Sequence, residues 1–182
     1  MFLALPVHAA ELEGVTLEDR VRVDGQELQL NGIALRTRAL FFKVYVAGLY
    51  LPEKSTSAAG ALAAKGAKRI QFTMVRDAAA EQFVESIMHA MRANHSEAEL
   101  ARVKPQTDEL MAMIRRIGTS QKGATIVLDY APSADGTTLF VDGKPAGNSM
   151  AGEEFFRTLM RIWLGENPVQ LDLKEALLGG MQ

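Results

Sequence analysis

The stretch that most constrains this chain is residues 32–51, GIALRTRALFFKVYVAGLYL, in which two arginines precede a long apolar run. The run from Ala39 to Leu51 is rich in aromatic and β-branched residues, which is typical of a buried strand. Burying an unpaired charge is costly, so Arg36 and Arg38 at the mouth of such a strand need partners. The partner is either a carboxylate of the protein or the acidic end of a ligand, and the residues alone leave both open.

Tyr45 on the same run could add a hydroxyl donor to an arginine site. In one regular strand Arg36 and Tyr45 would face opposite sides, because their numbers differ by an odd count. They converge only if a turn or bulge lies near Thr37 to Leu40. Regular alternation would place Phe42, Val44 and Val46 on one face and Phe41, Lys43, Tyr45, Ala47 and Leu49 on the other.

Composition excludes several classes of function. The 182 residues suggest one domain that buries its own core, predicted to span residues 11–182. A net charge of −2 and Lys/Arg blocks no longer than two residues argue against nucleic-acid binding. The sequence has no cysteine, which excludes disulfides, thiolate nucleophiles and cysteine metal sites.

The first ten residues, MFLALPVHAA, are apolar and end in small residues before the polar Glu11. Small residues after an apolar run are typical of a signal-peptidase site, so residues 1–10 are interpreted as the remnant of a signal peptide. A tail or an added edge strand is the alternative. The mature chain would begin near Ala10 and be periplasmic or secreted by a bacterium. No later segment is long and apolar enough to span a membrane.

The order of predicted elements is strands, helices, strands, helices. Residues 21–30 alternate about Asp24-Gly25, which predicts a hairpin, and Asn31-Gly32 offers a second turn. The other predicted elements are strands 69–75, 124–130 and 137–141 and helices 58–64, 78–93, 96–117 with Pro105 interrupting, 153–164 and 169–178. Antiparallel hairpins with clustered helices indicate an α+β fold, one sheet with helices on a face.

The patterns that carry common chemistries are missing from the sequence. There is no Gly-rich phosphate loop, no zinc pattern around His89 and His95, and no serine with an evident His/Asp set. We therefore expect no metal and no cofactor. The nine methionines are either core packing or the walls of a plastic apolar pocket.

Residues 32–51 resemble the strand pair of the chalcone isomerase-like superfamily, in which an arginine precedes a strand ending in Gly48-Leu49-Tyr50-Leu51. The similarity continues through residues 69–77, RIQFTMVRD, with a helix after them, and through residues 142–165 with Pro168 beyond. It spans about residues 14–179 and looks closest to the bacterial exported branch. The resemblance implies an open-faced β-sandwich, a large antiparallel sheet against a layer of helices with a ligand cleft between.

The resemblance also assigns roles to residues. Plant enzymes of the family cyclise a chalcone with a guiding arginine and with threonine, tyrosine and asparagine donors. These positions correspond here to Arg36, Tyr45, Phe83 and about Ala90. Phe83 and Ala90 cannot donate the hydrogen bonds that would stabilise a developing enolate, so catalysis is not the expected activity.

An arginine with a tyrosine at the threonine position instead resembles the fatty-acid-binding members. We therefore expect a non-catalytic protein that holds a fatty acid or similar amphipathic carboxylate, with Arg36 and Tyr45 on the acid and Phe41, Phe83, Ile87 and the methionines around the tail. An isomerase or intramolecular lyase acting on an enone is the alternative, and a structural or partner-binding module without a small ligand is a third. The sequence does not indicate an oligomeric state.

Overall fold

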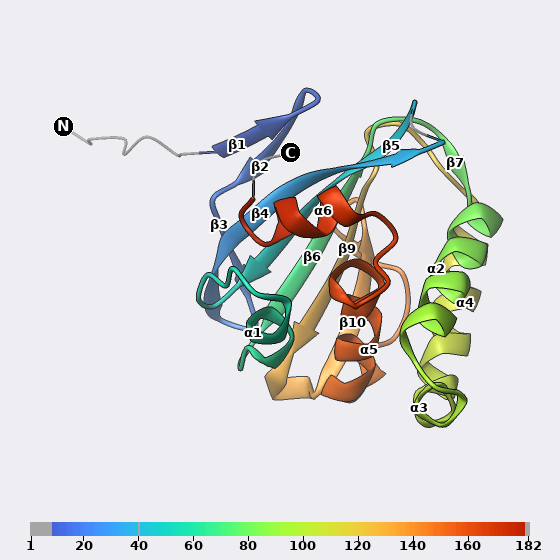
Figure 1. Ribbon diagram of the computed structural model, residues 1–182. Coiled ribbons are helices and arrows are strands. Elements are labelled where there is room, and N and C mark those ends of the chain that lie inside the picture. The colour runs from blue at the N-terminus through green and yellow to red at the C-terminus, as the bar shows by residue number, and fades with distance from the viewer. Residues whose placement is uncertain (1–8, 40, 181–182) are drawn as a thin grey trace.

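In the computed structural model, which describes residues 9–39 and 41–180, an antiparallel sheet forms the centre of the molecule (Figure 1). Its strand order is β11-β10-β9-β6-β5-β4-β3, and β12 pairs with β10. These strands are β3 (Arg20–Val23), β4 (Gln26–Arg38), β5 (Phe42–Leu51), β6 (Lys68–Met74), β9 (Thr125–Ala131), β10 (Gly136–Val141), β11 (Lys144–Pro145) and β12 (Met150–Ala151). Two small pairs lie apart, β1 (Ala9–Leu12) with β2 (Val15–Glu18) and β7 (Ala78–Ala79) with β8 (Thr119–Ser120).

Helices pack on one face of this sheet, with α5 and α6 in front of it in Figure 1 and α2 to α4 beside them. Their bounds are α1 (Ala58–Ala63), α2 (Ala80–Asn94), α3 (Glu97–Arg102), α4 (Lys104–Ile117), α5 (Glu153–Leu164) and α6 (Leu171–Leu177). A short 3-10 turn (Pro132–Ala134) joins β9 to β10. The fold is α+β, a large antiparallel sheet against a layer of helices, as the sequence predicts.

The helix boundaries follow local chemistry. Ser96 and Glu99 form a capping box at the start of α3, and Gly118 with φ 74° ends α4. Pro105 lies in the first turn of α4, where its missing N–H is not needed, and does not interrupt a helix. None of the helices in the described residues is long and apolar enough to cross a membrane.

The β3–β4 hairpin forms at Asp24-Gly25, as predicted, and both residues have positive φ. The second predicted turn, Asn31-Gly32, is wrong. The chain runs straight through it as β4, with only a bulge between Leu30 and Gly32. The longest strand is therefore β4, and the run expected from Ala39 begins as β5 at Phe42.

The reason for this bulge is the docking of α6. The Asn31 amide donates to the carbonyls of Leu177 at 2.7 Å and Ser55 at 3.0 Å. A Cβ on Gly32 would lie 2.1 Å from the carbonyl oxygen of Ala176. Asn31 and Gly32 thus allow α6 to pack close to the sheet. The prediction of a turn did not consider this role of glycine.

The sheet has an apolar core on each face. The larger core lies under the helices and the smaller one, which includes Leu17, Val46 and Tyr50, lies on the opposite face with contributions from the β1–β2 hairpin. Ala9 and Ala10 belong to β1, which pairs with β2. Residues 1–8 lie outside the described residues, so the signal-peptide interpretation and the extent of the domain stay predictions.

Candidate functional site

A cavity of about 440 Å³ lies between the sheet and helices α2, α4 and α5. That volume falls within the roughly 300–1,000 Å³ typical of small-molecule sites. Its walls are mainly apolar, and the aliphatic and aromatic side chains that line them are Phe42, Val44, Phe72, Met74, Phe83, Ile87, Leu110, Ile114, Ile117, Ile126, Leu128, Leu139, Leu159, Ile162, Trp163 and Val169. The polar groups that line it include Arg36, Tyr45, Arg38 and Arg76.

Arg36 on β4 and Tyr45 on β5 lie directly opposite each other and both line this cavity. They share a face because the chain turns after Ala39, so they occupy neighbouring strands and not one strand. Val44 is an extra residue in β5, since Arg36 pairs with Tyr45 but Thr37 pairs with Lys43. This bulge brings Val44 and Phe42 into the same cavity as Tyr45, and the predicted alternation of faces is wrong at this point.

Gln170, the residue before α6, holds Arg36 in place. Its side-chain oxygen accepts from the Nη1 of Arg36 at 3.1 Å and from the backbone N–H of Thr37 at 2.8 Å. Its amide donates to the carbonyl of Leu35 at 3.1 Å. Arg36 Nη1 also donates to the carbonyl of Thr37 at 2.5 Å. All of these acceptors are neutral, so they orient the guanidinium without cancelling its charge.

Tyr45 is buried, and its hydroxyl accepts a hydrogen bond from the indole N–H of Trp163 at 3.0 Å. Burial raises the pKa of Tyr45, against opposing effects of the Trp163 hydrogen bond and of Arg36. The phenol therefore stays protonated at neutral pH. Because Trp163 and Arg36 are both donors, the tyrosine proton remains for an acceptor such as a carboxylate oxygen. The Phe72 ring also contacts the rings of Tyr45 and Trp163, at 5.0 and 5.1 Å between centroids.

Positive charge gathers at the mouth of the cavity. Arg36, Arg38 and Arg76 line it together with one acid, Asp77. The Asp77 carboxylate accepts from the backbone N–H of Lys122 at 2.8 Å. Among the residues the structure describes, no ion pair includes Arg36, Arg38 or Arg76. The site thus joins an apolar interior to an end with a net positive charge, three arginines against one acid.

The structure places four of the five predicted site residues together, since Arg36, Tyr45, Phe83 and Ile87 all line the cavity. Phe41 does not. Its side chain is 82% exposed in the β4–β5 turn, and Phe42 lines the cavity instead. The physical reason is that the chain is turning at Phe41, so no neighbouring strand covers the ring.

The methionines mostly pack the core. Met74 lines the cavity, whereas Met91, Met111, Met113 and Met160 are buried elsewhere in the larger core. Ala90 is likewise buried in that core. Sequence reasoning missed Gln170 and Trp163 as site residues. Nothing in the sequence indicated that the indole N–H of Trp163 would reach Tyr45.

No cluster of three or more His, Cys, Asp or Glu side chains that could hold a metal ion occurs in residues 9–39 and 41–180. Apart from Asp77, the polar side chains of the cavity are arginines, hydroxyls and an amide, which bind anions or hydrogen-bonding groups.

Comparisons with known proteins agree with this architecture. The model of the chalcone isomerase-like family matches residues 9–179. The crystal structure of an Arabidopsis thaliana fatty-acid binding protein superposes with a TM-score of 0.74 at 15% identity, covering 94% of this chain and 96% of that one. At that identity the likeness shows the fold alone. A search of curated proteins finds no match.

Proposed function

Because the chain belongs to the chalcone isomerase-like family, we propose that it binds a fatty acid or a similar amphipathic carboxylate. The observation that carries the proposal is the Arg36–Tyr45 pair, which offers donors and an unneutralised positive charge at one end of an apolar cavity. A carboxylate matches these donors in charge and in geometry, since guanidinium binds it through two parallel hydrogen bonds.

The apolar walls explain why the acid would carry a hydrocarbon tail. Each methylene that leaves water for such a wall contributes about 0.8 kcal/mol. A short polar acid would gain only the head-group contacts, whereas a long chain adds favourable free energy along the whole cavity. The structural similarity to a fatty-acid binding protein supports this choice of ligand class.

Phe83 argues against the isomerase alternative. It lines the cavity at the position where the resemblance expects a tyrosine donor, and a phenyl ring cannot polarise a carbonyl. A periplasmic or secreted location is also a proposal, resting on the apolar residues at the start of the sequence.

The test uses two readouts of the intact protein. Trp163 is the single tryptophan of the chain and lines the cavity, so its fluorescence should change as oleate fills the site. Native mass spectrometry of the purified protein should show a co-purifying lipid acid. We expect both signals to weaken strongly in Arg36→Ala, because the carboxylate loses its counter-charge, while circular dichroism stays that of the wild type.

Two outcomes would refute the proposal. One is a wild-type protein that neither carries a lipid acid nor responds to oleate by fluorescence or calorimetry. The other is chalcone cyclisation clearly above background that Arg36→Ala abolishes, which would establish the isomerase instead.

A further inference from the structure

The turn between β4 and β5 exposes two consecutive phenyl rings. Phe41 is 82% exposed and Phe42 is 55% exposed. Within the described residues, the other large hydrophobic side chain of this kind is Leu171. Figure 1 shows the turn at the upper right, at the end of the sheet from which β7 leads into α2. Exposing two adjacent phenyl rings to water is unfavourable, and exposed apolar patches often mark a surface that another molecule covers.

Two arginines lie beside the rings, and neither forms an ion pair among the described residues. The Arg76 guanidinium lies over the Phe42 ring, 5.2 Å from its centroid, and Arg38 is exposed on the strand that enters the turn. Of the other nearby charges, Lys43 forms an ion pair with Glu13 at 2.7 Å and the Asp77 carboxylate accepts from a backbone N–H. A bond from a neutral N–H leaves Asp77 its negative charge, so two arginines against this one acid give the surface around the rings a net positive charge.

This surface is continuous with the mouth of the cavity. Phe42, Arg38 and Arg76 belong to the lining of the cavity, and Phe41 is the next residue outward along the turn. Whatever covers the two rings also stands over the opening through which a ligand would pass.

We propose that the β4–β5 turn docks on an anionic lipid bilayer, with Phe41 and Phe42 at the boundary of headgroups and acyl chains and with Arg38 and Arg76 at the lipid phosphates. Aromatic rings favour that depth and basic side chains favour the phosphate layer. A second copy of the chain fits the surface less well, because a two-fold contact would bring the same arginines against each other. The proposal goes beyond fatty-acid binding, since docking needs no ligand in the cavity.

Flotation with vesicles of equimolar phosphatidylcholine and phosphatidylglycerol tests the proposal on ligand-free protein. We expect binding to fall about 10-fold in Phe41→Ser, since one ring leaves the membrane, and about 5-fold in Arg38→Ser. Lys54→Ser is the matched charge control, because Lys54 is exposed just past the opposite end of β5. It should bind as the wild type does, and vesicles of phosphatidylcholine alone should bind all variants weakly.

Absence of cysteine from the chain allows a second readout. A polarity-sensitive dye on Phe41→Cys should shift to the blue on anionic vesicles, and the same dye on Lys54→Cys should not. The proposal is overturned if wild-type protein stays in the aqueous fraction, if both labels respond equally, or if Phe41→Ser instead abolishes a dimer seen by sedimentation. Oleate binding in solution should be unchanged in Phe41→Ser, so a failure of docking is separable from a failure of ligand binding.

Discussion

At the scale of single residues, the site depends on how the charge of Arg36 is left available. Gln170 fixes the guanidinium with a neutral oxygen, and Trp163 occupies the acceptor side of the Tyr45 hydroxyl. Both neighbours orient the pair without supplying a negative charge. A partly buried cation arranged this way is costly until a counter-charge completes it, so the proposed carboxylate should also stabilise the fold.

Arg36→Lys should therefore weaken oleate binding although it keeps the charge. An ammonium cannot reproduce the two-point contact of guanidinium and does not fit the Gln170 acceptor in the same geometry. We expect a loss of affinity of about 10-fold by fluorescence titration, in the range of a hydrogen bond to a charged group. Arg38→Lys, at the exposed mouth, is the matched control and should change affinity much less. Equal effects at the two positions would contradict the assignment of Arg36.

The sequence named Arg36 and Tyr45 as candidates, and it did not indicate which residues would hold them. Their convergence could be stated only as a condition, a turn or bulge between them, and the structure supplies both a turn after Ala39 and a bulge at Val44. Gln170 and Trp163 come from more than a hundred residues away, and no local pattern reports a side-chain contact of that range. Phe41 was misplaced because alternation was extended into residues that turn.

At the scale of elements, the contact between α6 and β4 positions the site. Asn31 of β4 forms a hydrogen bond with the C-terminal end of α6. Gln170, at the N-terminal end of α6, forms one with Thr37 of β4. The dipeptide Asn31-Gly32 reads as a turn by local propensity, but tertiary packing overrides it. Asn and Gly are favoured in turns, but a glycine without a Cβ and a side-chain amide suit a close contact between two backbones equally well.

Gly32→Ala tests that contact. The new Cβ would meet the backbone oxygens of Ala176 and Leu177 at 2.1 and 2.6 Å, so α6 must move away from the sheet. We expect a loss of about 1–3 kcal/mol in the free energy of unfolding and weaker oleate binding, because Gln170 moves with the helix. Gly143→Ala is the control: its φ is 76° with open space around it, so stability should fall without a change in affinity. Unchanged affinity in Gly32→Ala would show that α6 does not position Arg36.

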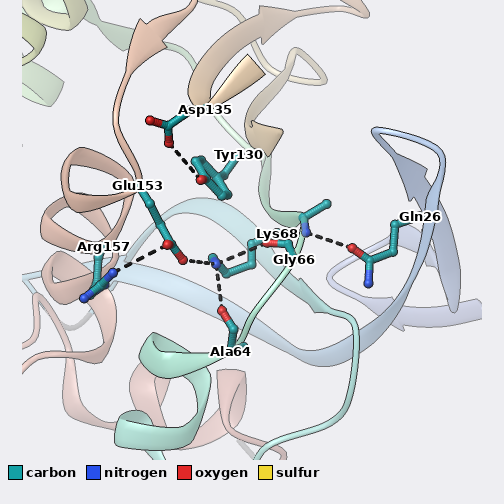
Figure 2. Close-up of polar contacts among 9 residues, drawn as sticks. Gln26, Ala64, Gly66, Lys68, Tyr130, Asp135, Glu153 and Arg157 are labelled. Atoms are coloured by element: carbon teal, nitrogen blue, oxygen red, sulfur yellow. Dashed lines mark hydrogen bonds and ion pairs between the residues drawn. The ribbon is translucent and has the colours of Figure 1, made fainter. Parts of the chain in front are cut away.

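A second tertiary connection joins α1, β6 and α5 through the buried Lys68 (Figure 2). Its ammonium donates to the carbonyls of Ala64 at 2.8 Å and Gly66 at 3.2 Å and to the Glu153 carboxylate at 2.9 Å. It also lies 4.9 Å from the centre of the Tyr130 ring. All three N–H donors are used, so this buried lysine is structural and leaves no group free for chemistry.

Lys68→Met should destabilise the protein by about 3 kcal/mol in urea unfolding, since it leaves one carboxylate and two carbonyls without their donor. The Lys68 hydrogen bond lowers the pKa of Glu153 below 4.5 in the folded state. That stabilisation is present above the unfolded pKa and is lost as pH falls, so the difference between variant and wild type should narrow in acid. Oleate affinity at neutral pH should be unaffected. If the difference in free energy of unfolding between Lys68→Met and the wild type did not depend on pH, the loss would come from packing and not from the ion pair.

At the scale of the whole molecule, the sheet separates two environments. The helix-covered face holds the cavity, and the opposite face is covered in part by the β1–β2 hairpin over Leu17 and Tyr50. The α+β class followed from the order of periodic segments alone, because hairpins and clustered helices admit few arrangements. The cover on the second face could not be predicted, since residues 9–18 carry only a short apolar pattern.

Ionisation of the three tyrosines at high pH reports on the unfolding of the whole molecule. Tyr45, Tyr50 and Tyr130 are all buried, and burial is the main cause that raises each pKa, to about 12 for Tyr50 and for Tyr130. Each folded pKa lies above the unfolded value of 10.0, so the folded state keeps protons that the unfolded state has released. The contribution of these tyrosines to the free energy of unfolding is therefore complete below pH 10 and is lost as the pH rises toward 12.

We expect tyrosinate absorbance to appear together with the loss of far-ultraviolet circular dichroism, in one cooperative step. Tyr50→Phe should shift that step to higher pH, because one of the released protons is gone. Tyrosinate that forms near pH 10 in a protein still folded by circular dichroism would mean that at least one of these rings is open to solvent.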